Sequence, residues 1–194
     1  MSESELALRT ERLLLHRWRS ADVDAFADLN VDPVVMEFLG PPRTRQETDA
    51  MVAAFEKEWD DKGYGIFAVT WTETGASIGF IGLHEPTFVA PFTPCVEIGW
   101  RLAQSAWGRG LATEGALAVR QWAHGPLGLD EIVSMTARVN VRSRRVMEKI
   151  GLHHDPADDF DHPGASVPSH LRPHVLYRGR ADEFEASSRE VSRL

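Results

Sequence analysis

Cysteine is almost absent from this sequence, since Cys95 is the single thiol in 194 residues. One thiol cannot form an intramolecular disulfide, and without a Cys-x-x-Cys pair the chain lacks the usual zinc-binding spacing. No apolar run approaches the roughly 18 to 20 residues that span a bilayer, and the N-terminus, Met-Ser-Glu-Ser-Glu, does not resemble a secretory signal. We therefore expect a cytoplasmic protein without a membrane partner and without a bound metal.

Positively charged residues are also few. The 21 Lys and Arg residues are outnumbered by 29 Asp and Glu residues, which gives a net charge of -8 at pH 7. A nucleic-acid-binding protein needs clustered Lys and Arg against the phosphates, so a direct nucleic-acid partner is not expected. The negative charge instead favours a cationic substrate such as an ammonium group.

The remaining composition is that of a globular chain, with 43% hydrophobic and 26% charged residues. A length of 194 residues suits one domain better than two. We expect a single domain over residues 1–194, with a core at about 8–180 and a polar C-terminal tail at about 183–194. Nothing in the sequence determines the oligomeric state, and a homodimer is one of the possible assemblies.

Helix signals dominate the first third of the chain, after an initial strand that we expect within residues 6–18. Ser20 has the side chain of an N-cap, and the helix that it starts should end near Asp32, because the residue before a proline is disfavoured in a helix. Thr44 and Glu47 have the spacing of a capping box. They predict the start of a second helix, which a Lys-Gly pair should end.

Alternation of apolar and polar residues replaces the helical spacing further along the chain. The elements expected there are, in order, strands at 64–71, 77–83 and 96–102, a helix at 110–124, a strand at 132–138, a helix at 140–150 and a strand at 175–180. This order predicts the α+β class, with a mixed sheet and helices on its faces. A Rossmann domain is excluded, because strands and helices do not alternate regularly and Gly-x-Gly-x-x-Gly is missing.

A glycine-rich turn is the strongest chemical signal. Residues 107–114 read Trp-Gly-Arg-Gly-Leu-Ala-Thr-Glu and lie between a predicted strand and a predicted helix. Glycines let a backbone approach a bulky anion, and the amides at a helix N-terminus can bind a phosphate, so a pyrophosphate is a candidate ligand. A lone Gly-x-Gly is more often an ordinary tight connection. A P-loop is excluded, because no Gly-Lys-Ser or Gly-Lys-Thr follows.

A second motif occupies residues 140–152, which read Asn-Val-Arg-Ser-Arg-Arg-Val-Met-Glu-Lys-Ile-Gly-Leu. Asn140 follows a predicted strand and could cap the next helix, and Ser143, one turn inside, could face the same cleft as the glycine-rich turn. Taken alone, Asn140 is equally explained as a simple N-cap, and the basic residues as a solvated helix face.

Together, the two motifs resemble those of the GNAT acetyltransferases, and within them the RimJ/RimL-like branch that acetylates protein N-termini. In that family the turn binds the CoA pyrophosphate through backbone amides. Trp107, Gly110 and Ala112 stand at its matching positions, although the superfamily usually has Gln or Arg at the first of them. Asn140 and Ser143 match the family's Asn-x-x-Ser. The resemblance covers most of the chain.

The resemblance implies a GNAT-like fold, with a mixed and mostly antiparallel sheet of six to seven strands, about four helices, and a split in the sheet at the CoA cleft. Acetyl-CoA is the implied co-substrate, without a metal. The CoA-binding residues that the resemblance implies are Arg101, Leu102, Trp107, Gly108, Arg109, Gly110, Leu111, Ala112, Thr113, Asn140 and Ser143.

The resemblance also implies candidates for proton transfer. An acceptor amine is largely protonated at neutral pH, with a pKa of about 7.7 to 8.0 at a protein N-terminus, so a base assists its reaction. Glu97 matches the family's strand-borne glutamate, although it could also be an exposed strand acid without a role. Ser143 is the implied proton donor to the departing thiolate, because Met147 stands where many relatives have tyrosine, or it is only a helix cap. A β-bulge at Gly99 is expected to free a backbone amide for the developing oxyanion.

Other polar residues carry weaker signals. Segment 153–162 contains His and Asp side chains of the metal-ligand type, but their spacing is irregular. We expect this segment, with His170, Arg172 and His174, to rim the acceptor site. Cys95 precedes the strand that bears the candidate base, yet no histidine near it in sequence is present to activate it as an acyl-accepting nucleophile.

The function predicted by these features is acetyl transfer from acetyl-CoA to a primary amine by direct attack in a ternary complex. The resemblance favours a protein N-terminal α-amine as the acceptor. One alternative is an acetyltransferase for a small-molecule amine, such as an antibiotic or a metabolite, and another is a CoA-binding sensor without turnover. No motif in the sequence identifies the acceptor.

Overall fold

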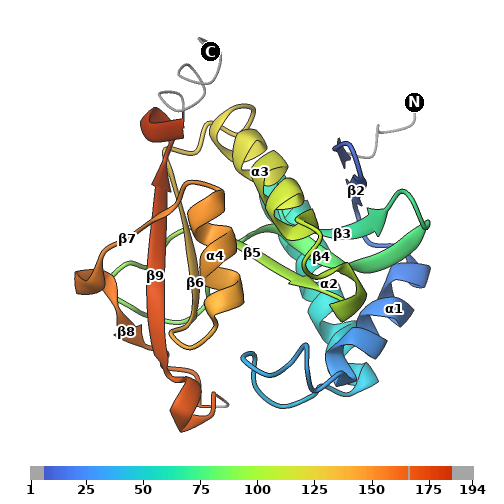
Figure 1. The fold of residues 1–194 in the computed structure, drawn as a ribbon, viewed down its shortest axis with the longest axis horizontal. Helices are drawn as coiled ribbons and strands as arrows, with labels where there is room; N and C mark the ends of the chain where they lie inside the picture. Colours follow the sequence, from blue (N-terminus) through green and yellow to red (C-terminus); the bar gives the residue numbers. More distant parts are fainter. Residues whose placement is uncertain (1–6, 166, 185–194) are drawn as a thin grey trace.

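The computed structural model describes residues 7–165 and 167–184. Their strands form one sheet in the order β1-β2-β3-β4-β5-β6-β9-β7, and β8 pairs with β9 (Figure 1). The strands are β1 (Leu8–Arg9), β2 (Leu13–His16), β3 (Ile66–Trp71), β4 (Ala76–His84), β5 (Glu97–Leu102), β6 (Glu131–Ala137), β7 (His153–His154), β8 (Phe160–Asp161) and β9 (Pro173–Arg180). Every pair is antiparallel except β5 with β6. The predicted mixed, mostly antiparallel α+β sheet is confirmed, and three two-residue strands extend its six longer ones.

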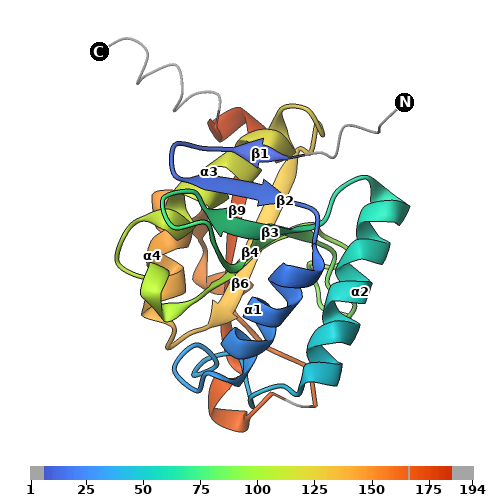
Figure 2. The same cartoon turned by 90° about the vertical axis from the view of Figure 1, so that its right-hand side faces the viewer.

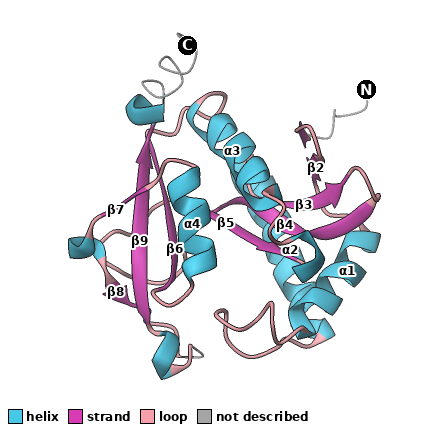
Figure 3. Ribbon diagram, viewed as in Figure 1, coloured by secondary structure: helices cyan, strands magenta, loops and turns pink. Residues whose placement is uncertain are grey.

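Helices cover both faces of this sheet (Figure 3). They are α1 (Ser20–Val31), α2 (Arg45–Lys62), α3 (Leu111–His124) and α4 (Val141–Lys149). Figure 2 shows α1 and α2 side by side in front of the sheet. None of the helices in the described part of the chain combines the length and the apolar character that crossing a bilayer requires.

Two neighbouring residues of β4 show that α1 and α3 lie on opposite faces. Phe26 of α1 packs against Phe80, with ring centroids 5.6 Å apart. A Cβ placed on Gly115 of α3 would lie 2.4 Å from the side chain of Ile81, the next residue along β4. Because successive strand residues point to opposite sides of a sheet, the sheet separates the α1 side from the α3 side.

The helix starts follow local signals, with one correction. The Thr44 hydroxyl accepts from the Glu47 amide at 3.2 Å, and the Glu47 carboxylate accepts from the Thr44 amide at 2.7 Å, so the predicted capping box of α2 is present. Ser20, however, is not the N-cap of α1 but its first helical residue. The Asp22 carboxylate accepts from the amide of Arg19 at 2.9 Å, which starts the helix one residue earlier than predicted.

The N-terminal segment is a short hairpin rather than the single strand expected within residues 6–18. The antiparallel strands β1 and β2 turn at Thr10, whose amide donates to the Leu13 carbonyl at 2.9 Å. Glu114 of α3 holds this turn, because its carboxylate accepts from the Thr10 hydroxyl at 2.6 Å and from the amide and Nε of Arg12 at 2.8 and 2.6 Å. The division of this segment into two strands therefore depends on Glu114, which is distant in sequence.

The sheet splits between β5 and β6. These parallel strands share a single residue pair, Glu97 with Val133, while β5 pairs with β4, and β6 with β9, along their whole lengths. Beyond the shared pair the strands diverge, as Figure 1 shows, and one edge of each is left without a partner strand. The split that the resemblance implied is present.

A bulge does not create this split. The pairing of β4 with β5 runs without a register shift, with Gly82 opposite Gly99, so the β-bulge expected at Gly99 is wrong. The register shift of this region lies in the β3–β4 pairing instead, beside Gly79, whose φ of 124° suits only glycine. Backbone groups of β5 are freed by divergence from β6 rather than by a bulge.

The hydrogen bonds that Glu114 accepts from Thr10 and Arg12 predict how the stability of the protein depends on pH. Burial alone would raise the pKa of Glu114, but the hydrogen bonds from Thr10 and Arg12 outweigh burial and hold that pKa below its usual value. Because the folded pKa is lowered, the carboxylate contributes stability above the unfolded pKa of about 4.3, and the contribution is lost as the pH falls through the folded value. Glu114→Gln should therefore lower the free energy of unfolding by about 2 kcal/mol at pH 7, and by less as the pH approaches 3.

Urea denaturation at both pH values measures this difference. Glu73→Gln, in the exposed turn between β3 and β4, is the matched control and should cost less than about 0.5 kcal/mol. An equal loss for Glu114→Gln at both pH values would show that the negative charge of Glu114 does not stabilise the fold.

Candidate active site

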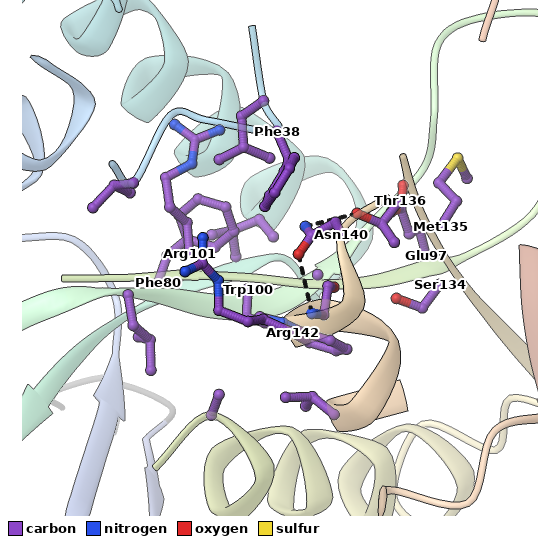
Figure 4. Close-up of a pocket in the computed structure, with 18 of the residues that line it drawn as sticks. Phe38, Phe80, Glu97, Trp100, Arg101, Ser134, Met135, Thr136, Asn140 and Arg142 are labelled. Atoms are coloured by element: carbon purple, nitrogen blue, oxygen red, sulfur yellow. Dashed lines mark hydrogen bonds between the residues drawn. The ribbon is translucent and has the colours of Figure 1, made fainter. Parts of the chain in front are cut away.

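A cavity of about 720 Å³ opens at the split between β5 and β6. Consecutive residues of both strands line it, Gly99, Trp100, Arg101 and Leu102 from β5 and Ser134, Met135 and Thr136 from β6. A strand that presents a face contributes every second residue, so consecutive lining residues indicate that the strand edges face the cavity. Figure 4 shows labelled residues of both strands around this space.

The glycine-rich turn forms one wall of the cavity and leads directly into α3. Gly108 and Gly110 have left-handed φ values of 72° and 78°. A Cβ added to Gly108 would meet no atom within 4 Å, and one added to Gly110 would meet only the Arg12 guanidinium at 3.6 Å, so open space lies beside the turn. No side chain caps α3. The first amides of a helix have no intrahelical acceptor, so this wall fits a phosphate group.

The structure places all but one of the predicted CoA-binding residues along this cavity. Those that line it are Arg101, Leu102, Trp107, Gly108, Gly110, Leu111, Ala112, Thr113, Asn140 and Ser143. Arg109 is the exception: its Nε donates to the Ser105 carbonyl at 3.2 Å, and its guanidinium lies 5.2 Å from the Trp71 ring centroid. Its side chain therefore packs outside the cavity.

Trp107, the residue that departs from the superfamily pattern, anchors the turn. Its indole Nε1 donates to the Leu102 carbonyl at the end of β5, at 2.8 Å. The guanidinium of Arg142 lies 4.4 Å from the Trp107 ring centroid and also pairs with Glu37 at 2.7 Å. The tryptophan thus holds the turn against the strand and gives Arg142 a stacking surface between the turn and the loop after α1.

Asn140 connects α4 to the free edge of β6. Its side-chain oxygen accepts from the Ser143 amide at 3.2 Å, and its amide nitrogen donates to the Thr136 hydroxyl at 3.0 Å (Figure 4). Asn140 is therefore the N-cap of α4 and lines the cavity as well. Ser143 is half-buried in the first turn. Met147, at the position of the family's tyrosine, is 1% exposed in the hydrophobic core and does not reach the cavity.

Glu97 forms a half-buried pair with a residue that sequence reasoning missed. Its side chain is 12% exposed, and its Oε2 lies 3.0 Å from Nε2 of His84, the residue opposite it on β4. Burial alone would lower the pKa of His84, but the adjacent Glu97 carboxylate outweighs burial and raises that pKa above its ordinary value. Both side chains line the cavity. Only the register between β4 and β5 could have identified His84.

Two histidines close the cavity near this pair. The rings of His162 and His174 lie 5.0 Å apart, and Phe88 packs 4.7 Å from His162. Burial lowers the pKa of both histidines, so they are mostly neutral at pH 7. All three residues line the cavity, which agrees with the expected rim of His162 and His174. His170 and Arg172, expected beside them, do not line it.

Two acids of segment 153–162, Asp158 and Asp159, make ion pairs instead of lining the cavity. Asp159 contacts His154 at 2.7 Å and Arg138 at 3.1 Å, and Asp158 contacts Arg178 at 2.7 Å. Within residues 7–165 and 167–184, no group of three or more His, Cys, Asp or Glu side chains is arranged to hold a metal ion.

Cys95 lies just before β5 and is not part of the cavity wall. Burial, with a smaller effect of Glu97, raises the pKa of its thiol to about 11. The thiolate is the nucleophilic form, so a thiol with this pKa is poorly suited to accept an acyl group at neutral pH.

Known proteins are similar to this chain in sequence. Residues 12–153 match the family model for the acetyltransferase (GNAT) domain. The chain is 40% identical over 135 residues to a protein of Aspergillus fumigatus named FsC-acetyl coenzyme A-N(2)-transacetylase. That match covers 65% of this chain and 56% of the relative, so the chain spans little more than half the relative's length.

Solved structures also share the fold. An acetyltransferase from Agrobacterium tumefaciens superposes with a TM-score of 0.75 at 32% identity, over 93% of this chain and 97% of that chain. A ribosomal-protein-S5-alanine acetyltransferase from Vibrio fischeri superposes with a TM-score of 0.71 at 13% identity, over 92% and 98%, which shows a common fold alone. Because the family model spans well over half of the sequence and includes the split strands, the glycine-rich turn and the α4 motif, the chain belongs to the GNAT acetyltransferase family.

Proposed function

We propose that this chain is an N-acetyltransferase that moves an acetyl group from acetyl-CoA to a primary amine by direct attack. One observation carries the proposal. The divergence of β5 and β6 brings the free strand edges, the open start of α3 and the half-buried Glu97 into one cavity. Each of these features meets a separate requirement of acyl transfer to an amine.

The glycine-rich turn is the proposed CoA site. The amides of Leu111, Ala112 and Thr113, with the two left-handed glycines before them, would hold the pyrophosphate. The bound co-substrate supplies an acetyl group activated as a thioester. The unpaired edge of β5 supplies backbone N–H groups that can donate to the oxygen that gains negative charge during transfer.

Glu97 is the proposed base. An ammonium group must lose a proton before its nitrogen can attack, and a carboxylate inside the cavity can accept that proton. His162 and His174, mostly neutral at pH 7, do not repel a cationic acceptor. The hydroxyl of Ser143, which lines the cavity from the first turn of α4, is the proposed donor to the departing sulfur. The raised pKa of Cys95 supports direct transfer over an acyl-enzyme.

The acceptor class has two candidates. The motif resemblance to the RimJ/RimL-like branch supports a protein N-terminal α-amine. The name of the 40%-identical relative supports an amine on a smaller molecule, since that protein is called an N(2)-transacetylase. A location in the cytoplasm and a homodimeric state remain predictions from the sequence.

Amine-dependent release of free CoA tests the proposed function. We expect acetyl-CoA hydrolysis to be slow without an acceptor and thiol release to rise with a productive amine. A panel of short peptides with free N-termini and of small primary amines, with N-acetylated peptides as controls, would separate the two acceptor classes. Binding of CoA without thiol release for any amine would favour a non-catalytic CoA sensor instead.

A substitution in the turn tests the CoA site. Gly110→Val should raise the dissociation constant for acetyl-CoA at least about tenfold, because a branched side chain is strained at a left-handed φ and obstructs the approach of the anion. Isothermal titration measures this constant. Gly128→Val is the matched control, since Gly128 also has a left-handed φ but lies outside the cavity. Unchanged affinity in a folded Gly110→Val protein would remove the turn from the CoA site.

The pH dependence of the rate tests Glu97. Glu97→Gln should lower the amine-dependent rate about 100-fold near pH 7, and the loss should shrink as the solution itself deprotonates the amine at higher pH. His84→Gln keeps the carboxylate but removes the imidazolium that stabilises its negative charge below the raised pKa of His84. This variant should move the acidic limb of the profile to higher pH. A wild-type profile for Glu97→Gln would leave the carboxylate without a catalytic role.

A further inference from the structure

Among the arginines that line the cavity, the two that come from β5 and from the loop before α2 have no acidic partner in the described part of the chain. Arg101 comes from β5 and Arg43 from the loop between α1 and α2, and both line the cavity. Within residues 7–165 and 167–184, neither guanidinium forms an ion pair with a carboxylate. Two acids of this region have other partners, since Glu37 of the same loop pairs with Arg142 and Asp24 of α1 with Arg45, each at 2.7 Å.

The immediate contacts of these arginines leave hydrogen-bonding capacity unused. Arg101 donates to the side-chain oxygen of Asn30, and its guanidinium lies 5.6 and 5.5 Å from the ring centroids of Phe26 and Phe80. The Nε atoms of Arg101 and Arg43 are both buried without a hydrogen-bond partner. Burial, and to a smaller extent the charge of Arg43, lowers the pKa of Arg101 to about 10, so Arg101 remains cationic at pH 7.

Arg101 and Arg43 are half-buried like charges close enough to affect each other, and such a pair is costly when no anion lies between the two groups. Buried charges in proteins are normally paired. The guanidinium presents a planar fork of donors that matches a carboxylate. In a chain with a net charge of -8, a pair of arginines free of acids therefore points to a ligand that supplies the negative charge.

The arginine pair lies on the same side of the sheet as the proposed base. Arg101 is opposite Phe80 on β4, and Glu97 is opposite His84, so all four side chains share the α1 side. The phosphate-binding turn leads instead into α3, on the other side. Although the resemblance implied that Arg101 contributes to the CoA site, its guanidinium contacts α1.

Free space connects the arginines to the base. Gly99 lies between Glu97 and Arg101 on β5, and a Cβ built on it would meet no atom within 4 Å. Figure 4 shows Arg101 with Phe38 at one side of the pocket and Glu97 with Ser134 at the other. Four residues along a strand span about 13 Å, so groups held at the two ends would lie roughly 8 to 13 Å apart.

We propose that Arg43 and Arg101 bind a carboxylate of the acceptor, so that the substrate is an amine carrying an anionic group roughly 8 to 13 Å from the reacting nitrogen. This inference rests on the proposed N-acetyltransferase function and specifies its acceptor. Gly99 leaves room for the spacer between the two groups. The amine then lies beside Glu97 and the carboxylate lies between the two guanidinium groups.

Matched acceptors test the proposal. The pair 8-aminooctanoate and 8-aminooctanamide differ only in the charge of one end, and 3-aminopropanoate has the charge at too short a distance. We expect the wild-type protein to prefer the acid over the amide at least about tenfold in kcat/KM, and to use the short acid poorly. Equal use of the acid and the amide would overturn the proposal while leaving the acetyltransferase function intact.

Substitutions assign the preference to the two arginines. Arg43→Gln and Arg101→Gln should each raise KM for 8-aminooctanoate about tenfold and leave KM for the amide nearly unchanged. Arg45→Gln is the matched control, because Arg45 is exposed, pairs with Asp24 and does not line the cavity. If Arg101→Gln does not fold, Arg43→Gln, in a loop, carries the test.

Binding measurements separate the remaining outcomes. Calorimetric affinity for acetyl-CoA should be the same in the wild type and both variants; a parallel loss would mean that the arginines bind a CoA phosphate, which would overturn the proposal. The unreactive product 8-acetamidooctanoate should bind the wild type more tightly than its amide and lose this advantage in the variants. Because this readout needs no turnover, failure of the acetyltransferase function and failure of the carboxylate site are distinguishable.

Discussion

The divergence of β5 from β6 is the constraint on which the rest of the site depends. The two parallel strands share only the pair of Glu97 and Val133, yet each is held along its whole length by its other neighbour. Unpaired backbone groups are costly when they are buried, so edges of this kind need a ligand or water to satisfy them. The fold thus keeps a polar backbone cleft open inside a sheet whose core is otherwise closely packed.

Two chemical environments meet at this cleft. On one wall, the glycines before α3 and its uncapped start offer backbone N–H groups to an anion. On the α1 side, Glu97 and His84 stand at one end and Arg101 and Arg43 at the other. An amine is attracted to the acidic end, and an acid to the basic end. The overall charge of -8 conceals this local separation, which would orient a doubly charged acceptor.

Several features could be predicted because they form within one or two turns of chain. The capping box of Thr44 and Glu47, the turn at 107–110 and the cap at Asn140 each join residues that are close in sequence, so local geometry is sufficient to specify them. Hydrophobic periodicity likewise located five of the six longer strands and the four helices within a few residues. Glu97 was found because its position before the turn matches the family.

The sequence by itself therefore determined the order of the longer elements, the glycine-rich turn and the α4 cap, since neighbours along the chain settle each of them. Only the tertiary structure decided that His84 pairs with Glu97, that Glu114 breaks the N-terminal strand into a hairpin, and that β5 is freed by divergence rather than by a bulge. Among the described residues, it also places no carboxylate in an ion pair with Arg101 or Arg43. Each of these outcomes depends on strand register or on contacts between distant residues, and one sequence carries no local signal for which distant residues meet.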